Sequence, residues 1–166
     1  PITYLTVIVR EFFVETINPA LLTDLPKLRP YQREASRTIL DSVFNARGHT
    51  ITVEMARQAG KNELSAQVGL LLLSLGMGRH EDLVKCAPTF HPQLRISIRR
   101  LWRHVATSGL RNISSMEPNA IRVGKSRIYF LSAEPSANVV GHTASLLLEV
   151  DEAQDVDEEK FDREFR

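Results

Sequence analysis

The sequence predicts an α/β fold of three layers, in which a mainly parallel central sheet is flanked by helices. Two observations lead to this class. Short runs of β-branched and aliphatic residues alternate along the chain with longer stretches of helical periodicity. One of those helices is opened by a Gly-Lys pair that closely follows such a run. Because strands that alternate with helices are joined by crossover connections, they favour a parallel sheet covered on both faces.

A domain boundary is predicted near residue 27. Residues 1–27 mix apolar residues with Asn18-Pro19 and Leu25-Pro26, and we expect them to be an extended or partly helical lead-in. The segment 28–166 is long enough to bury the core of one domain. The chain has no Met at position 1 and stops soon after its most acidic motif, so we expect a piece of a longer protein.

The first half of the predicted domain has the order helix, strand, helix. Apolar residues recur at helical spacing over 31–44. The β-branched run 50–53 then predicts a strand. A polar loop at 56–60 leads into a helix from 61 to about 75, which ends at Gly76.

The second half repeats this order. Residues 83–87 predict a strand, and residues 93–105 predict a helix with one apolar side. The segments 120–123 and 127–131 are expected to be two strands paired across a Gly-Lys turn. The apolar run 146–150 predicts a buried strand.

Charge and composition narrow the classes of function. Residues 149–166 carry nine acids and three bases, so the rest of the chain has eighteen bases and eleven acids. A basic body suits a polyanion such as nucleotide or DNA, although an ordinary solvated surface is the alternative. The single cysteine, Cys86, excludes an internal disulfide and is expected to be a buried thiol. The longest apolar run, 68–73, is far too short to cross a bilayer, so no membrane partner is expected.

The loop at 56–60 has the pattern of a phosphate-binding loop. A helix N-terminus directs backbone N–H groups and the positive end of its dipole at an anion. A lysine at the first helical position adds a charge for the β- and γ-phosphates. Gly60 and Lys61 match this pattern, whereas Met55 and Asn62 stand where a glycine and a hydroxyl residue are usual. A Gly-Lys pair at an ordinary helix start is the alternative.

An acidic pair, Asp151-Glu152, directly follows the buried run 146–150. Hydrolysis of a phosphoanhydride needs a carboxylate that holds Mg²⁺ and a base that orients the attacking water. Ligands bind at the carboxyl ends of strands in an open parallel sheet, so we expect this pair to face the loop. The alternative is that both acids cap a following helix.

Four segments together resemble the ATPase domain of the large terminase subunit of tailed phages. They are 56–63 (Ala-Arg-Gln-Ala-Gly-Lys-Asn-Glu), 148–154 (Leu-Glu-Val-Asp-Glu-Ala-Gln), 28–32 (Leu-Arg-Pro-Tyr-Gln) and 87–90 (Ala-Pro-Thr-Phe). The first is similar to the family's variant phosphate-binding loop and the second to its second ATPase motif. The third is similar to its adenine-contacting segment. The resemblance covers most of 28–156 and implies a P-loop NTPase fold.

The resemblance also implies roles for individual residues. Lys61 would bind the β- and γ-phosphates, Asp151 would hold Mg²⁺, and Glu152 would activate water. Arg57 would act on the γ-phosphate or sense its loss, and Gln32 would read the adenine edge. The expected contacts with ATP are Gln32, Arg57, Gln58, Ala59, Gly60, Lys61, Asn62 and Glu63; those with Mg²⁺ are Asp151 and Asn62; the catalytic residues are Glu152, Arg57 and Lys61.

The family's partners are implied in the same way. Its subunits form a homo-oligomeric ring at the portal protein of an empty capsid, work with a small terminase subunit, and pump double-stranded DNA inward. They do so in the cytoplasm of an infected or lysogenic bacterial host. A nuclease domain follows the ATPase domain in that family, and we expect this chain to be truncated before it. Arg95, Arg99 and Arg103 recur every four residues and are a candidate DNA-contacting face, whose alternative is a solvated helix surface.

Two other functions fit these residues. A two-domain nucleic-acid helicase also has an Asp-Glu pair in its second acidic motif. Against it, Arg57-Gln58-Ala59 lacks the Gly or Ser that helicases prefer near the loop start, and Asn62 replaces their Thr. With Met55 and Asn62 in the loop, a domain that binds nucleotide and never turns it over is the third alternative.

Overall fold

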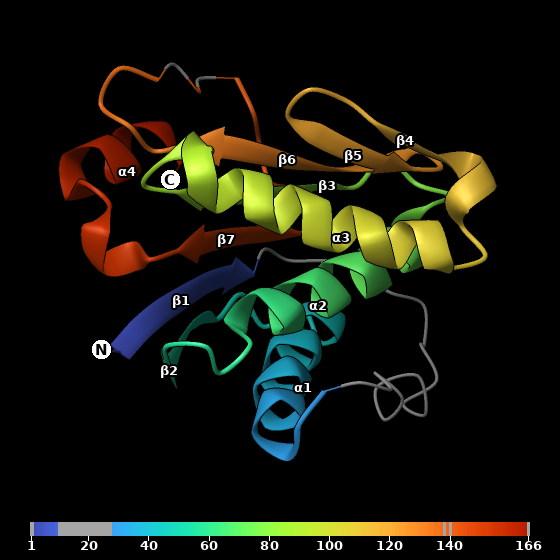
Figure 1. Cartoon of the computed structure of the whole chain (residues 1–166), viewed down its shortest axis with the longest axis horizontal. Coiled ribbons are helices and arrows are strands. Elements are labelled where there is room, and N and C mark those ends of the chain that lie inside the picture. The colour runs from blue at the N-terminus through green and yellow to red at the C-terminus, as the bar shows by residue number, and fades with distance from the viewer. Residues whose placement is uncertain (1, 10–27, 138, 140, 166) are drawn as a thin grey trace.

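The computed structural model describes residues 2–9, 28–137, 139 and 141–165, which form a seven-stranded mixed sheet and four α-helices (Figure 1). The strands are β1 (Ile2–Val9), β2 (Thr50–Ala56), β3 (Asp82–Ala87), β4 (Ser114–Met116), β5 (Ala120–Val123), β6 (Ser126–Ser132) and β7 (Leu147–Asp151). The α-helices are α1 (Pro30–Phe44), α2 (Lys61–Gly76), α3 (Arg95–Thr107) and α4 (Glu158–Glu164). Shorter helical turns are η2 (Phe90–Leu94), η3 (Arg111–Ile113) and η4 (Ala153–Asp155).

The strand order across the sheet is β2-β1-β7-β3-β6-β5-β4. Among the described strands, β7 with β3 and β3 with β6 are parallel pairs, whereas the other four neighbouring pairs are antiparallel. The expectation of a mainly parallel sheet is therefore wrong, and the sheet is mixed. A tight hairpin at Gly124-Lys125 forces β5 to run against β6. In the other half of the sheet, β1 runs antiparallel to both of its neighbours, β2 and β7.

The helices and strands predicted between residues 31 and 150 are confirmed, with small differences at their ends. β2 continues to Ala56, and α3 begins at Arg95 after the η2 turn. The hairpin of β5 and β6 is present, with Ala120 paired to Tyr129. The short edge strand β4 was not expected.

The strand β1 lies in the interior of the sheet, between β2 and β7. It belongs to the segment expected to be a lead-in, of which residues 10–27 lie outside the described residues. Leu5 and Val7 are buried against the same core as α2. In the strand register, Leu5 pairs with Val53 on one side and with Asp151 on the other. Therefore β1 joins β2, which leads into the loop at 56–60, to β7, which ends at the acidic pair.

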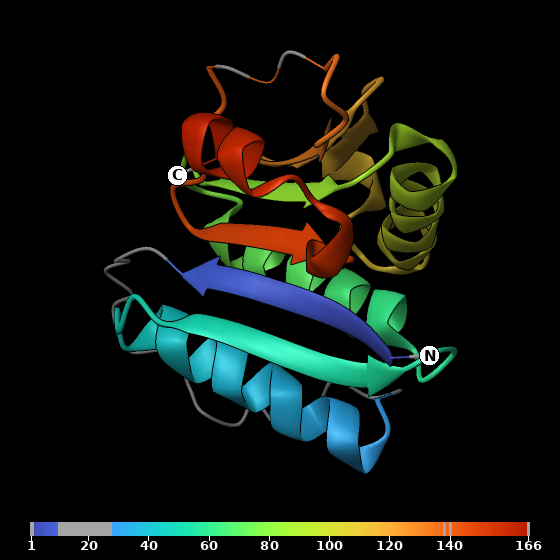
Figure 2. The same ribbon diagram turned by 90° about the vertical axis from the view of Figure 1, so that its left-hand side faces the viewer.

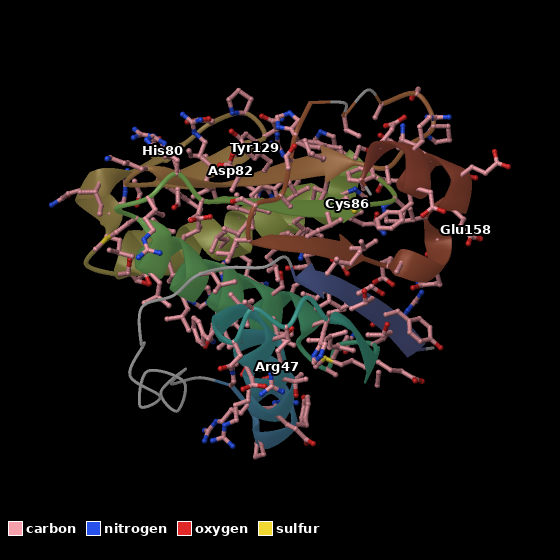
Figure 3. All side chains as sticks on the ribbon, turned by 180° about the vertical axis from the view of Figure 1, so that it is seen from behind. Arg47, His80, Asp82, Cys86, Tyr129 and Glu158 are labelled. Carbon is pink, nitrogen blue, oxygen red and sulfur yellow. The ribbon has the colours of Figure 1, made fainter. Side chains whose placement is uncertain are left out.

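Two core clusters lie on opposite faces of the sheet. The larger joins the sheet to α1, α2 and α3 through residues that include Leu40, Leu72 and Leu101. The smaller includes Phe165 at the end of α4 and Cys86 on β3, which is buried as expected (Figure 3). Figure 2 shows α3 and α4 on opposite sides of the sheet. The helix–sheet–helix layering is therefore present.

Within the described ranges, every helix falls short of the length and apolar character that a bilayer-spanning segment needs.

Replacing Leu5 by Ala is expected to lower the free energy of unfolding by about 2–5 kcal/mol, because it removes a buried side chain from the centre of the sheet. Urea denaturation followed by circular dichroism measures this change. Thr52→Ala, at an exposed position of the neighbouring strand β2, is the control and is expected to cost less than about 1 kcal/mol. A Leu5→Ala effect no larger than the control's would mean that β1 is not part of the folded core.

Candidate nucleotide-binding site

The loop between β2 and α2 places a helix N-terminus and a lysine at one edge of the sheet. β2 ends at Ala56, and a turn closed by the hydrogen bond from Ala59 N to Ala56 O (3.1 Å) leads to Gly60, the N-cap of α2. Gln58 and Gly60 have left-handed backbones, with φ of 63° and 88°. Lys61 is the first residue of α2. Because the first N–H groups of a helix have no acceptor within it, they are available to an anion.

The start of α1 holds this loop in place. Gln32 is buried, and its Oε1 accepts a hydrogen bond from Arg29 N (2.8 Å). Its Nε2 donates to Ala59 O (2.9 Å) and Gly60 O (3.1 Å). Tyr31 Oη also donates to Ala59 O (2.8 Å). The positive φ at position 60 favours glycine, and a Cβ atom there would also displace the Gln32 amide from its contacts with the loop.

These contacts give Gln32 a role that the sequence alone does not indicate. Both ends of its amide are hydrogen-bonded to protein backbone, where they position the loop between β2 and α2. The adenine contact inferred from the resemblance stays a prediction.

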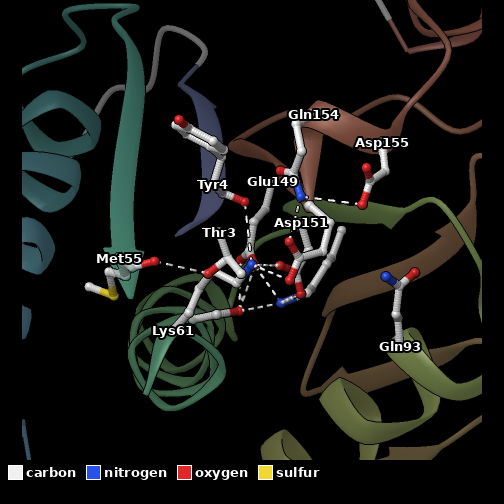
Figure 4. A network of polar contacts seen from close by, with 12 residues as sticks. Thr3, Tyr4, Met55, Lys61, Gln93, Glu149, Asp151, Gln154 and Asp155 are labelled. Carbon is white, nitrogen blue, oxygen red and sulfur yellow. Dashed lines mark hydrogen bonds and ion pairs between the residues drawn. The ribbon is translucent and has the colours of Figure 1, made fainter. Parts of the chain in front are cut away.

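The acidic pair at the end of β7 meets the start of α2 (Figure 4). Lys61 Nζ lies 2.7 Å from Asp151 Oδ1 and 2.7 Å from Glu152 Oε1. Its third contact is the carbonyl oxygen of Tyr4 on β1, at 3.4 Å. Lys61 and Asp151 are buried, whereas Glu152 is half-buried. The two predicted motifs are therefore brought together by one ammonium group.

Glu152 has an uncommon backbone conformation, with a φ of 51°. Its N–H donates to Tyr4 O (3.0 Å), and its Oε2 accepts a hydrogen bond from Gln154 Nε2 (2.8 Å). Strained residues persist only where their surroundings hold them, and they cluster at functional sites. In this structure the contacts hold the Glu152 carboxylate beside Lys61.

A second ion pair lies in the core behind the first. Side chains alternate along strands, so Lys85 on β3 and Glu149 on β7 both point toward α2, and the two are register partners. Lys85 Nζ lies 2.5 Å from Glu149 Oε1 and 3.6 Å from Asp151 Oδ2, and donates to Ser65 Oγ (2.7 Å). Ser65 in turn donates to both oxygens of Glu149 (2.7 and 2.9 Å). Lys85 is 1% exposed, and its partners Glu149, Asp151 and Ser65 are also buried.

The charges of this network are interdependent. Burial would raise the pKa of the Asp151 carboxyl, but the ammonium groups of Lys85 and Lys61 outweigh it and hold that pKa below its usual range. Burial would lower the pKa of Lys85, but the carboxylates of Glu149 and Asp151 raise it instead. Asp151 therefore keeps its negative charge at neutral pH.

The oxygen atoms of the site suit Mg²⁺. This ion is usually held by one or two protein oxygens together with phosphates and water. Asp151 supplies a charged carboxylate, and Asn62 Oδ1 is a buried acceptor with no hydrogen-bond partner among the described residues. The described part of the chain has no group of three or more His, Cys, Asp or Glu that could hold a metal alone. A nucleotide-bound Mg²⁺ does not need such a group.

A cavity of about 540 Å³ opens beside the loop, within the range of ligand-binding pockets. It is lined by Thr3, Ala56, Arg57, Gln58, Gly60, Lys61, Asn62, Arg100 and Glu152. Of the predicted nucleotide contacts in the loop, Ala59 and Glu63 are not in this lining. The Ala59 carbonyl is bonded to α1, and the Glu63 carboxylate is turned toward α3.

Three basic side chains, those of Arg57, Lys61 and Arg100, line the cavity. Lys61 is paired with Asp151 and Glu152, and Arg100 is paired with Glu63, so a polyanion would take the place of these carboxylates. Arg100 was not among the predicted site residues, and neither was Thr3 of β1. The sequence signal for Arg100 is weak, because it stands beside Arg95, Arg99 and Arg103 in a helix whose basic residues suggest a solvated face.

Replacing Lys85 by Met is expected to lower the free energy of unfolding by about 3–5 kcal/mol, because Glu149 is left buried without its cation. The double variant Lys85→Met with Glu149→Leu is expected to be more stable than the single variant, since it removes both charges. Urea denaturation compares the two, with Lys125→Met at an exposed turn as the control. A double variant less stable than the single one would contradict this account of the network.

No family model matches this chain, and no curated protein and no solved structure does either.

Proposed function

We propose that this chain is the ATPase domain of a viral DNA-packaging motor, with a P-loop NTPase fold. It binds Mg²⁺-ATP at the loop of residues 56–61 and couples hydrolysis to translocation of double-stranded DNA into a capsid. The observation that carries the proposal is the position of Lys61. It starts a helix beside a basic cavity and lies 2.7 Å from both acids of the pair Asp151-Glu152. The DNA-packaging part rests on the resemblance to large terminase subunits.

In this proposal Lys61 exchanges partners when nucleotide binds. Its ammonium turns from the two carboxylates to the β- and γ-phosphates, and the N–H groups at the start of α2 bind the same phosphate chain. The carboxylate of Asp151 then becomes available to Mg²⁺. The ammonium group of Lys85 still lies near this carboxylate and partly neutralises its charge. Arg57 is exposed on the loop and lines the cavity, so its guanidinium is placed to contact the γ-phosphate.

Glu152 is assigned the role of the base. Water attacks the γ-phosphorus, so a new P–O bond forms and the bond from that phosphorus to the β–γ bridging oxygen breaks. ADP leaves with that oxygen, and a proton of the water passes to the Glu152 carboxylate. Mg²⁺, when bound, neutralises charge on the phosphates. The contacts of Glu152 with Tyr4 and Gln154 orient the carboxylate for this task.

The exposed side of α3 supports the DNA part of the proposal. Arg95, Arg99 and Arg103 are exposed, while Leu101 and Val105 of the same helix are buried. The three guanidinium groups therefore belong to one solvent-facing side, where they are accessible to phosphates. The ring, the portal protein, the small terminase subunit and the bacterial cytoplasm belong to the same proposal.

The nucleotide site is tested by calorimetry with Mg²⁺-ATP. Lys61→Ala is expected to weaken binding by about 10–100-fold or more, because it removes a charge-assisted contact with the phosphates. Glu152→Gln is expected to bind Mg²⁺-ATP and to lose phosphate release, which a coupled assay measures. Lys125→Ala, at an exposed turn outside the cavity, is the matched control.

Absence of binding by folded wild-type protein would overturn the proposed function. Binding that Lys61→Ala leaves intact would place the nucleotide elsewhere. If wild type and Glu152→Gln both bind and neither releases phosphate, the chain is a nucleotide-binding module and not an ATPase.

Replacing Arg95, Arg99 and Arg103 by Ala is expected to weaken binding to double-stranded DNA and to flatten its salt dependence. Each lost phosphate contact reduces the slope of log K against log salt by about 0.9. Fluorescence anisotropy with a short duplex at several salt concentrations measures this slope. The control replaces Arg37, Arg47 and Lys125, which are exposed elsewhere and carry the same total charge. An equal effect of the control set would show a general charge effect and not a DNA face on α3.

A further inference from the structure

We propose that Arg100 on α3 binds the terminal phosphate of the nucleotide and thereby makes the site prefer a triphosphate to a diphosphate. This assignment deepens the proposed function and rests on it. Arg100 would act in cis, from the same chain that supplies Lys61 and Glu152.

Arg100 lines the same cavity as Lys61, Asn62 and Glu152. Among the described residues that line this cavity, it is the one that belongs to α3. The helices α3 and α2 pack against each other, and Figure 1 shows α3 lying across α2. Attacking water must lie near Glu152, so the terminal phosphate is the one that occupies this cavity. A guanidinium in the cavity wall is therefore placed to reach that phosphate.

Arg100 is paired with a carboxylate that a phosphate can replace. Its Nη1 lies 3.1 Å from Glu63 Oε2, in the first turn of α2. A carboxylate and a phosphate both accept hydrogen bonds from the guanidinium fork, so one replaces the other without a change in chemistry. The Arg100 side chain is 37% exposed, so water can enter during such an exchange.

Glu63 does not depend on Arg100 alone. His104 Nε2 lies 2.9 Å from Glu63 Oε1, and Gln67 Nε2 donates to the same oxygen (2.8 Å). When Arg100 turns to a phosphate, Glu63 keeps these two partners, so its carboxylate stays hydrogen-bonded. Glu63 therefore holds the guanidinium beside the phosphate-binding turn and does not lose all of its partners on releasing it.

This arrangement separates the roles of the three cationic side chains in the cavity. Lys61 serves the β- and γ-phosphates, so its loss weakens binding of ATP and of ADP. Arg57 reaches the γ-phosphate from an exposed loop. Arg100 reaches it from a helix that is packed on α2. Removal of Arg100 is therefore expected to weaken triphosphate binding alone.

The test compares affinities for a non-hydrolysable ATP analogue (AMP-PNP) and for ADP, both with Mg²⁺, by calorimetry. Arg100→Ala and Arg100→Gln are each expected to weaken AMP-PNP binding by about 10–100-fold, the size of a charge-assisted hydrogen bond. ADP binding is expected to change by less than about 3-fold. Arg37→Ala, an exposed arginine of α1 outside the cavity, is the control for both ligands.

Retained ADP affinity in the same variant shows that it is folded. Unchanged AMP-PNP affinity in both Arg100 variants, or an equal loss of both ligands in both, would overturn the assignment and leave Arg100 a structural contact between α2 and α3. If wild-type protein binds neither ligand, the nucleotide site itself fails and the assignment fails with it. If wild type binds both ligands and the Arg100 variants keep its ratio of affinities, only the Arg100 assignment fails.

Discussion

The ammonium group of Lys61 is the contact through which the separate parts of this site become one. Lys61 is the first residue of α2. Its Nζ contacts the carboxylates of Asp151 and Glu152 at the end of β7 and the carbonyl oxygen of Tyr4 on β1. A cation buried to this degree needs compensating anions, because the cost of removing it from water is large. The positions of α2 and β7 are thus tied together by charge as well as by packing. Lys85 extends the same constraint into the core, so that two cations and three carboxylates share one network.

Local signals account for what the sequence predicts correctly. The helix from Lys61 and the strand before Asp151 are each marked by residues close in sequence, and both are present as expected. The place of β1 in the sheet carries no such signal. Its partners β2 and β7 lie far along the chain, and a period of two residues does not specify which strand will be its neighbour. For the same reason the sequence does not specify the direction of β1. Its two antiparallel pairings, together with those of β4 with β5 and β5 with β6, make the sheet mixed.

The site shows the same division. The pattern around Gly60-Lys61 and the pair Asp151-Glu152 were found because each motif is contiguous, and the structure brings them together. The contact of Lys85 with Glu149 joins two strands, and its signal is a single charge of opposite sign at the centre of each apolar run. Read together, those charges would have indicated an ion pair, because buried charges in proteins are paired.

The order of the sheet has a consequence for how this molecule acquires its site. The strand β1 pairs with β7, which lies far along the chain, and in this register Leu5 is the partner of Asp151. Pairings over so long a separation close slowly, because chain entropy opposes them until their contacts form. Before β7 pairs with β1 and β3, Lys61 has neither Asp151 nor Glu152 beside it. The acidic half of the site therefore depends on the pairing in the sheet that spans the longest stretch of the chain.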